Sequence, residues 1–515
     1  MRLIDFFDRG VSIDPDRAFL VEDGRVTTYA DAQRRSLAIA ERLKQAGALP
    51  GSRIAVLSHN SAFAFEAILG VVRSGSAWVS LNARSTVDER AGFMANCAVD
   101  TLVYAADFGG EVERIGRSCS QLRRTIALDD LCRPGAGEAE TDRSLAILED
   151  RERPDPDRIS MIAASGGTTG PSKGVMISDR NWVVGMAAAQ IYWDDHPVYL
   201  LAAPMTHAGG GLVFALSQMG ATNIILKEFD PAKVLRLIQE QSVTHLFLPP
   251  TAIYALLDHP DIGTYDYSSL KYFVYAASPI SEERLRQAIG VFGPVMAQFY
   301  GQTECFMCIS FFSQEQHVAA MADERLRHRL VSCGRPSRFV RVAIAGDDGA
   351  FLPTGQRGEI VIQSGLEFVG YVNALEETAH VKRDGWHHTG DIGYLDEDNY
   401  LYIVDRARDM IISGGFNIFP SEVERIVETH PNVRECIVIG TPDAKWGEAV
   451  TAVVVLDDRA DWNEADFIAW CRKRMSGMNT PKVVHVVDSL PKTPTGKVLK
   501  REVRKAFWEG QGRNV

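Results

Sequence analysis

The sequence lacks the long apolar runs and the surplus of positive charge that mark two common classes of protein. None of its hydrophobic runs approaches the roughly 18–20 residues that a helix needs to cross a bilayer. Its 55 Lys and Arg residues face 67 Asp and Glu residues, which gives a formal net charge of -12. This acidic balance argues against a nucleic-acid surface and against an anionic membrane as partner. We therefore expect no nucleic-acid partner and no integral membrane segment.

The sequence also lacks a paired cysteine motif. Cys305 and Cys308 have the spacing of metal ligands, but without a second pair or an adjacent histidine we expect no zinc or redox site there. The eight cysteines are scattered and mostly lie in apolar surroundings, which suits reduced thiols in a core. The first nine residues mix acids into apolar positions and lack a signal-peptide cleavage pattern. A cytoplasmic protein is expected.

What the sequence does contain is a regular alternation of strand-like and helix-like segments. At 515 residues the chain exceeds what one hydrophobic core usually supports. The alternation predicts an α/β fold with a large N-terminal domain of helix-flanked sheets over residues 1–405. This domain includes a connector near 133–158 and a small β-subdomain at about 335–405. The order strand, helix, strand, strand, helix, strand, helix then predicts a small α+β domain over 406–515.

The most informative segment is Ser165–Gly174, which follows the apolar run 161–164. Four glycines, four hydroxyl side chains and Lys173 fall within these ten residues. Glycines let backbone N–H groups converge on an anion, and the hydroxyls and the lysine add donors and charge. The segment therefore predicts a polyphosphate-binding loop, although its lysine and glycine are in the reverse of the Walker order. A flexible solvated loop is the alternative.

Two later segments end in an acid that could serve a nucleotide. Glu304 closes Phe299–Glu304, directly after a strand, where a carboxylate can hold Mg²⁺ and Tyr300 can offer an aromatic face to a base. The alternative is a buried turn in which Glu304 caps a helix. Asp391 closes the segment 385–391, and an ionised Asp can accept hydrogen bonds from both hydroxyls of a ribose. The alternative there is an ordinary turn aspartate.

The C-terminal part holds two further unusual segments. The charge cluster 405–409 and the turn Gly414-Gly415 suggest a hinge followed by a backbone that approaches a ligand closely, with a solvated linker as the alternative. Near the C-terminus, Lys497 ends the Pro/Thr/Gly-rich turn 491–497, which can present a mobile positive charge. The alternative is a lysine without a role, as for most lysines near a C-terminus.

Taken together and in this order, the five segments resemble the motifs of the adenylate-forming superfamily. Its members include acyl- and aryl-CoA synthetases, firefly luciferase and nonribosomal adenylation domains, and the resemblance covers almost the whole chain. It implies ATP-dependent activation of a carboxylic acid to an acyl-adenylate, with ATP, Mg²⁺ and CoA as cofactors and a C-terminal domain that moves between the two steps. It leaves a homodimer open.

The resemblance also implies roles for individual residues. The nucleotide would be held by Ser165, Gly166, Gly167, Thr168, Thr169, Gly170, Lys173, Tyr275, Ala276, Ala277, Ser278, Tyr300, Gly301, Asp391 and Arg406. Thr169 and Glu304 would help to position Mg²⁺. Catalysis would depend on Lys497, Thr303, Glu304 and His207. The hinge would be Arg408, where relatives usually carry Asp or Lys, and CoA would meet Gly414, Gly415 and Trp446.

The acyl group and its acceptor are less well defined. His207 would lie near the substrate carboxylate, although a structural histidine at a helix start is the alternative, and Gly209, Gly210 and Gly211 would widen the acyl pocket. No acid stands near His207 to pair with an ammonium, so we expect a plain carboxylic acid, fatty or aryl. Met478-Asn479 replaces an aromatic–lysine pair that often contacts CoA. One alternative is therefore transfer of the acyl group to a carrier-protein phosphopantetheine. The other is a catalytically silent acyl-nucleotide binding protein.

Overall fold

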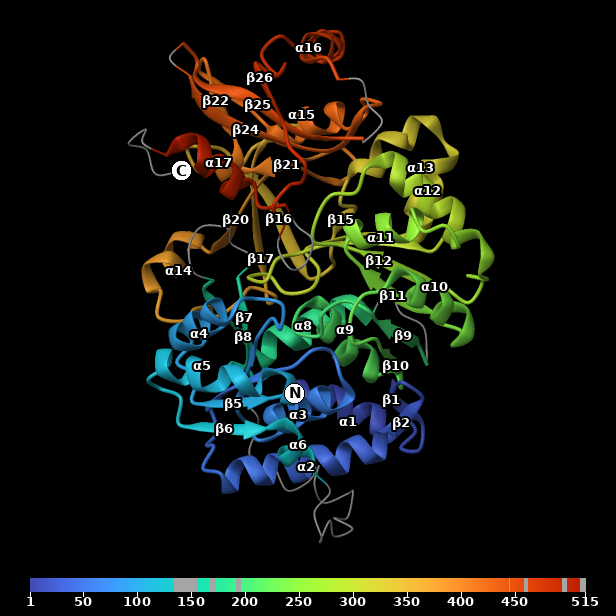
Figure 1. The fold of residues 1–515 in the computed structure, drawn as a ribbon, viewed down its shortest axis with the longest axis vertical. Coiled ribbons are helices and arrows are strands. Elements are labelled where there is room, and N and C mark those ends of the chain that lie inside the picture. Colours follow the sequence, from blue (N-terminus) through green and yellow to red (C-terminus); the bar gives the residue numbers. More distant parts are fainter. Residues whose placement is uncertain are drawn as a thin grey trace. The chain divides into compact units, whose positions relative to one another are not determined.

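The computed structural model describes residues 1–133, 155–165, 172–190, 196–443, 445–457, 462–492 and 498–509 (Figure 1). The chain forms two compact units, Met1–Arg341 with Gln363–His387 and Val342–Ile362 with His388–Val515. The boundary that we expected between residues 405 and 406 lies inside the second unit, because the strands around it group with the C-terminal segment. Most of the expected connector, residues 134–154, is outside the described ranges.

One sheet of the first unit has seven strands in the order β18-β8-β7-β4-β3-β5-β6. The strands β3, β4, β5, β6 and β7 pair in parallel, whereas β8 returns antiparallel to β7. The bounds are β3 Arg53–Leu57, β4 Ala77–Ser80, β5 Thr101–Tyr104, β6 Arg124–Ala127, β7 Ile159–Ala164, β8 Gly174–Ser178 and β18 Gly370–Tyr371. Because β7 and β8 form a hairpin, the expected phosphate loop connects the end of β7 to the start of β8.

The other sheet of the first unit has nine strands in the order β15-β14-β13-β12-β11-β9-β10-β1-β2. Its middle strands run in parallel, so their carboxyl ends meet at one edge, where ligands of α/β proteins commonly bind. The bounds are β1 Ala18–Glu22, β2 Arg25–Thr28, β9 Val198–Leu201, β10 Thr222–Ile225, β11 His245–Leu248, β12 Tyr272–Tyr275, β13 Met296–Tyr300, β14 Ser310–Phe312 and β15 Arg335–Pro336.

Helices flank both sheets, as the alternating pattern predicts. Several begin at a hydroxyl side chain that accepts a hydrogen bond from the first turn, such as Thr28, Ser61 and Ser281. The bounds are α1 Leu3–Ile13, α2 Tyr29–Gln45, α3 Ala62–Arg73, α4 Val87–Asn96, α5 Val112–Ser118, α6 Leu128–Cys132, α8 Asp179–Gln190, α9 Ala208–Ser217, α10 Pro231–Glu240, α11 Pro250–Leu257, α12 Glu282–Phe292, α13 Gln314–Ala322 and α14 Leu375–Val381. Within the described residues no helix is long and apolar enough to span a bilayer.

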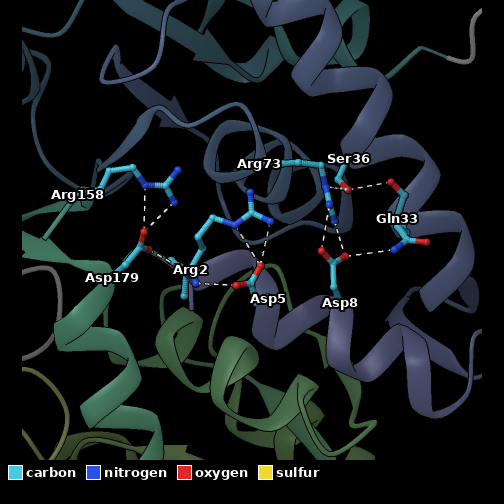
Figure 2. A network of polar contacts seen from close by, with 9 residues as sticks. Arg2, Asp5, Asp8, Gln33, Ser36, Arg73, Arg158 and Asp179 are labelled. Atoms are coloured by element: carbon cyan, nitrogen blue, oxygen red, sulfur yellow. Dashed lines mark hydrogen bonds and ion pairs between the residues drawn. The ribbon is translucent and has the colours of Figure 1, made fainter. Parts of the chain in front are cut away.

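Polar contacts between side chains join several of these helices (Figure 2). Asp8 on α1 accepts from Arg73 on α3 at 2.6 Å and from the amide of Gln33 on α2 at 3.2 Å. Asp179 at the start of α8 accepts from the backbone N–H of Leu3 at 2.9 Å and from Arg158 at 3.0 Å. These contacts join α1 to α2, α3 and α8.

The second unit begins with the β-rich part of the chain. The sheet order is β16-β17-β20-β19, with β21 also paired to β20, and β19 and the ends of β17 and β20 belong to the first unit. The bounds are β16 Val340–Ala345, β17 Gly358–Ser364, β19 Lys382–Arg383, β20 Trp386–Leu395 and β21 Leu401–Arg406.

The remainder of the second unit is a sheet covered by helices, in the order β23-β22-β25-β24, with β26 on β25. The bounds are β22 Ile411–Ser413, β23 Phe416–Ile418, α15 Pro420–Val427, β24 Val433–Asp443, β25 Gly447–Leu456, α16 Glu464–Arg472, β26 Val483–Val486 and α17 Lys500–Trp508. The predicted order of elements is confirmed, except that the first strand is a hairpin. The predicted α/β fold class is confirmed as well.

Candidate active site

The ends of the expected phosphate loop are held together by hydrogen bonds. The backbone N–H of Ser165 donates to the carbonyl of Lys173 at 2.9 Å, and the N–H of Lys173 donates to Oγ of Ser165 at 3.1 Å. These bonds close the β7–β8 hairpin and fix where the loop leaves and rejoins the sheet. Its central residues are outside the described ranges, among them Gly166, Gly167, Thr168, Thr169 and Gly170.

Lys173 and Glu304 meet through Tyr371, which the sequence pattern did not reveal. The ammonium of Lys173 lies 5.0 Å from the centre of the Tyr371 ring and 3.8 Å from a carboxylate oxygen of Glu377. The Tyr371 hydroxyl donates to Oε1 of Glu304 at 2.9 Å. Burial and the Glu304 charge raise the pKa of Tyr371 above its ordinary value, so the phenol stays neutral and remains a donor.

Glu304 itself stands in a tight turn after β13. A Cβ on Gly301 would lie 2.6 Å from the carbonyl oxygen of Met307, so the turn requires glycine at this position. The carbonyl of Glu304 accepts from the N–H of Phe368 at 2.8 Å. Thr303 is half-buried in the same turn. Because no helix follows directly, Glu304 does not cap one, so that part of the alternative is wrong.

The segment expected beside adenine follows β12. Tyr275 pairs with Gln298 in the register of β12 and β13, so Ala276 and Tyr300 leave neighbouring parallel strands at the same edge. Ala277 adopts a left-handed backbone with φ +75°, which is rare for alanine and common at binding sites. Ala276 and Ser278 are half-buried and Ala277 is exposed.

The side chain of Tyr275 requires a correction. It is fully buried, and its hydroxyl lies 3.0 Å from Nε2 of His317 and 3.4 Å from the amide oxygen of Gln298. Burial lowers the pKa of His317 to about 4, so this pair is neutral. The ring therefore packs in the core, and only the backbone of Tyr275 can serve a nucleotide.

His207 is the N-cap of α9, directly after the loop that leaves β9. Its Nδ1 lies 3.1 Å from the hydroxyl of Thr206. Desolvation lowers the pKa of its imidazole, which favours the neutral ring.

The sequence pattern missed Asn60, which holds the loop before His207. Its buried amide donates to the carbonyls of Ala203 at 3.0 Å and Leu226 at 3.1 Å, and its oxygen accepts from the N–H of Met205 at 2.8 Å. The sequence offered one signal for Asn60, namely a polar residue between a strand and Ser61, the N-cap of the next helix.

The three glycines at the start of α9 have a different local role from the one we expected. A Cβ on Gly210 would lie 1.8 Å from the carbonyl oxygen of Met205, and one on Gly209 would lie 3.0 Å from Leu201. A Cβ on Gly211 would lie 3.2 Å from the Phe306 ring. The space above these glycines is filled by the protein itself, so they permit close packing and do not open a wide pocket.

In the second unit, Asp391 and Arg406 are direct neighbours. They face each other across β20 and β21, and Nε of Arg406 lies 2.9 Å from Oδ1 of Asp391. The Asp391 side chain is buried within a strand rather than at a turn. The alternative of an ordinary turn aspartate is therefore wrong, and the pair that we expected at the ribose is brought together.

The expected hinge is a single 3₁₀ turn, Ala407–Asp409, between β21 and β22. Before it, the buried Asp405 accepts from the N–H of Ser421 at 2.8 Å. Arg408 is about one-third exposed, and burial together with the neighbouring Arg406 lowers its pKa, although a guanidinium stays charged. The segment is thus tied to the fold and is not a solvated linker.

The residues expected at CoA also come together. Gly414 and Gly415 form the β22–β23 turn with φ values of +59° and +83°. The N–H of Gly414 donates to the carbonyl of Trp446 at 2.7 Å, and a Cβ on Gly414 would lie 2.8 Å from the indole ring. The methyl group of Met478 would lie 3.7 Å from the same Cβ, so this residue also borders the turn.

Lys497 belongs to the undescribed segment 493–497, but the ends of that segment are defined. Lys492 and Val498 form an antiparallel bridge, and the N–H of Leu499 donates to the carbonyl of Pro491 at 2.8 Å. The turn therefore leaves and re-enters the fold at one place, directly before α17.

Two family models match most of this chain. The family model of the AMP-binding enzyme matches residues 7–372, and that of the AMP-binding enzyme C-terminal domain matches residues 422–497. The chain is 34% identical over 509 residues to a feruloyl-CoA synthase of Amycolatopsis sp, covering 97% of this chain and 98% of that protein. It is 45% identical over 370 residues to the medium/long-chain-fatty-acid–CoA ligase FadD8 of Mycobacterium tuberculosis, covering 70% of this chain and 63% of the relative.

Among solved structures, the amide bond synthetase McbA from Marinactinospora thermotolerans superposes with a TM-score of 0.87 at 31% identity, covering 98% of this chain and all of that one. The chain belongs to the AMP-binding enzyme family, within the adenylate-forming superfamily. Enzymes of this family activate carboxylic acids as adenylates and transfer the acyl group to CoA. This protein is accordingly an AMP-forming ligase.

Proposed function

We propose that this ligase activates a plain carboxylic acid, fatty or aryl, and transfers the acyl group to the thiol of CoA. The observation that carries the assignment of residues is the position of Tyr371. Its ring meets the ammonium of Lys173, and its hydroxyl meets the carboxylate of Glu304. The end of the phosphate loop and the acid expected at the metal are thereby neighbours.

In the first step, a carboxylate oxygen of the acid bonds to the α-phosphorus of ATP, and the bond from that phosphorus to the bridging oxygen breaks. Pyrophosphate leaves with the electron pair. Both reactants are anions, so catalysis is a matter of position and charge, and no protein nucleophile is needed. We assign to Lys497 the positive charge between the two anions and to Thr303 a hydrogen bond to the α-phosphate.

The residues fit a magnesium ion that is shared with the substrate. Mg²⁺ prefers oxygen ligands, keeps several waters and is commonly bound by one or two carboxylates together with phosphates. In the described ranges no three acidic, histidine or cysteine side chains gather into a complete metal site. A lone Glu304 carboxylate beside a phosphate loop suits the shared arrangement, with Thr169 as a further oxygen donor. When bound, the ion would neutralise phosphate charge.

The other nucleotide contacts follow the same logic. Asp391 would accept from the ribose hydroxyls, and Arg406 would hold that carboxylate in place. The backbone of 275–278 and the ring of Tyr300 would take the adenine. In the second step the CoA sulfur bonds to the acyl carbon, the bond from that carbon to the phosphate oxygen breaks, and AMP leaves with the electron pair while the thiol proton passes to solvent. Gly414, Gly415 and Trp446 would border the pantetheine, after a rotation at Arg408.

The acid class rests on the surroundings of His207 and on the relatives. Met205, Thr206 and Ala208 carry no acid that could pair with an amino-acid ammonium. A fatty-acid ligase and a feruloyl-CoA synthase are both among the similar proteins, which supports a fatty or an aryl acid without an ammonium group. A cytoplasmic location is supported by the eight buried cysteines, all of which lie in described ranges and none of which forms a disulfide there. A homodimer stays a prediction.

The test is a panel of acids with purified protein, ATP, Mg²⁺ and CoA. Octanoate, dodecanoate, benzoate and ferulate cover the two classes, and the release of AMP and pyrophosphate is measured. We expect release with at least one acid, with loss when Mg²⁺ is chelated. Lack of release with every acid would contradict the proposal.

Transfer to a carrier protein is the second candidate, because Met478 and Asn479 replace the aromatic–lysine pair of many relatives. The same reactions with a phosphopantetheinylated acyl carrier protein in place of CoA distinguish the two acceptors. Faster turnover with CoA supports the first, and faster turnover with the carrier protein supports the second.

A further inference from the structure

The first residue of α17 forms an ion pair that the nucleotide chemistry does not use. Nζ of Lys500 lies 2.7 Å from Oε1 and 2.9 Å from Oε2 of Glu424 on α15. The Oε1 atom of Glu424 also accepts from the N–H of Val438 on β24 at 2.6 Å. One carboxylate therefore connects α15, β24 and the start of α17.

The pair is shielded from water. The side chains of Lys500 and Glu424 are 23% and 14% exposed. Burial alone would lower the pKa of Lys500, but the carboxylates of Glu424 and Asp405 outweigh it and raise that pKa above its ordinary value. The ammonium is therefore charged throughout the physiological range. Burial raises the pKa of Glu424, and the charge of Lys500 opposes that rise.

The rest of α17 is held by apolar contacts, by one hydrogen bond and by a second ion pair, in which Arg504 lies 3.2 Å from Oε1 of Glu448. Val503 and Phe507 pack against a buried cluster that contains Ile437 and Ile439 of β24. The indole N–H of Trp508 donates to the carbonyl of Gly440 at 2.9 Å. A shielded ion pair is commonly no more stabilising than apolar residues of the same volume, but it can fix one arrangement among several. The Lys500 contact fixes the first turn of the helix.

That first turn is the base of the segment that carries Lys497. The bridge between Lys492 and Val498 closes the segment just before α17 begins. Three residues from Lys497 to Lys500 span at most about 11 Å even when fully extended, since each residue covers no more than about 3.6 Å. A displacement of Lys500 is therefore passed on to Lys497 with little chain to absorb it.

We propose that Lys500 and Glu424 are positioning residues for the adenylation step: their ion pair fixes the base from which Lys497 is presented. This inference rests on the role proposed above for Lys497. A catalytic group displaced by about 1 Å can lose roughly 10²-fold in rate, so the pair affects the first step strongly. The second step does not use Lys497 and is left unchanged.

The test separates the two half-reactions in Lys500→Met, which keeps length and removes charge. Adenylation is measured as exchange of labelled pyrophosphate into ATP with dodecanoate or ferulate. Thioester formation is measured with synthetic dodecanoyl-AMP or feruloyl-AMP and CoA. We expect exchange to fall by about 10²-fold, while thioester formation stays at the wild-type rate. Lys500→Arg keeps the charge and should restore most of the exchange, and Glu424→Gln should resemble Lys500→Met.

Lys505→Met on the exposed side of the same helix is the matched control and should leave both rates unchanged. An equal fall of both half-reactions in Lys500→Met would show a merely structural role and overturn the inference. Unchanged exchange would overturn it as well. Failure of the proposed function looks different, because wild-type protein would then show no exchange with any acid, or Lys497→Ala would exchange normally.

Discussion

The two carboxylates assigned to the nucleotide, Glu304 in the first unit and Asp391 in the second, are held in opposite ways. Among the described residues, the side-chain partner of Glu304 is the neutral phenol of Tyr371. Asp391 is bound at 2.9 Å to the guanidinium of Arg406. A phenol orients a carboxylate but leaves its negative charge, whereas a guanidinium orients the carboxylate and also neutralises its charge.

This difference matches the two tasks. An uncompensated carboxylate attracts a divalent cation, which is the role proposed for Glu304. A compensated one keeps its acceptor oxygens in place for uncharged hydroxyl groups, which is the role proposed for Asp391. The environment of each acid thus indicates its ligand more directly than the acid itself does.

The sharpest test of the comparison is Glu304→Gln. The amide keeps the shape and can still accept from Tyr371, but it cannot attract Mg²⁺ by charge. We expect the pyrophosphate-exchange rate to fall by about 10²–10³-fold, with a higher Mg²⁺ concentration needed for half-maximal rate. The control is Glu377→Gln, which removes a half-exposed carboxylate near the ammonium of Lys173. Wild-type Mg²⁺ dependence in Glu304→Gln would refute the assignment.

Asp391→Asn tests the other side of the comparison. The amide is a weaker acceptor and no longer pairs ionically with Arg406, so we expect the KM for ATP to rise about 10- to 100-fold, as for hydrogen bonds to charged groups. Wild-type enzyme should prefer ATP to 2′-deoxyATP and 3′-deoxyATP, and the variant should lose that preference. Kinetics with the three nucleotides measure this. A general loss of folding would lower all three rates equally and leave the preference intact.

The sequence was sufficient to predict where the expected site residues stand relative to their own strands. The end of the 165–174 loop, the turn at Glu304 and the Gly414-Gly415 hairpin all stand at strand ends, as the spacing predicted. The family resemblance predicted that Asp391 would act with Arg406, and the register of one hairpin brings the two together.

The contacts that the sequence did not reveal join distant parts of the chain. Tyr371 is 67 residues from Glu304, and Asn60 is 145 residues from Met205. Tyr371 carries no local pattern, and Asn60 carries only its place between a strand and the Ser61 helix cap, because each partner is set by how the strands are ordered in the sheets. The burial of the Tyr275 ring and the close packing at Gly210 were not predicted for the same reason, since burial of a side chain depends on what packs over it.

Tyr371→Phe isolates the phenol that distinguishes the two carboxylates. The ring that faces Lys173 remains, and only the hydrogen bond to Glu304 is lost. A hydrogen bond to a charged group contributes about 1.5–3 kcal/mol, so we expect pyrophosphate exchange to fall about 10- to 100-fold. Tyr371→Leu removes the ring as well and should fall further. A loss in Tyr371→Phe as large as that in Glu304→Gln would mean that the hydroxyl, not the carboxylate charge, is the essential group.

The smallest expected effect concerns the pH dependence of stability. In the first unit, the hydroxyl of Tyr275 contacts His317, whose imidazole is neutral. The pKa of His317 is about 4 in the folded protein and about 6.5 in an unfolded chain. The unfolded state therefore takes up a proton first as the pH falls below about 6.5, which favours unfolding by at most roughly 3 kcal/mol at pH 4. His317→Gln should reduce the fall in melting temperature between pH 7 and pH 5. The exposed His328→Gln should leave that fall unchanged, and equal behaviour of the two variants would show that His317 is not held neutral.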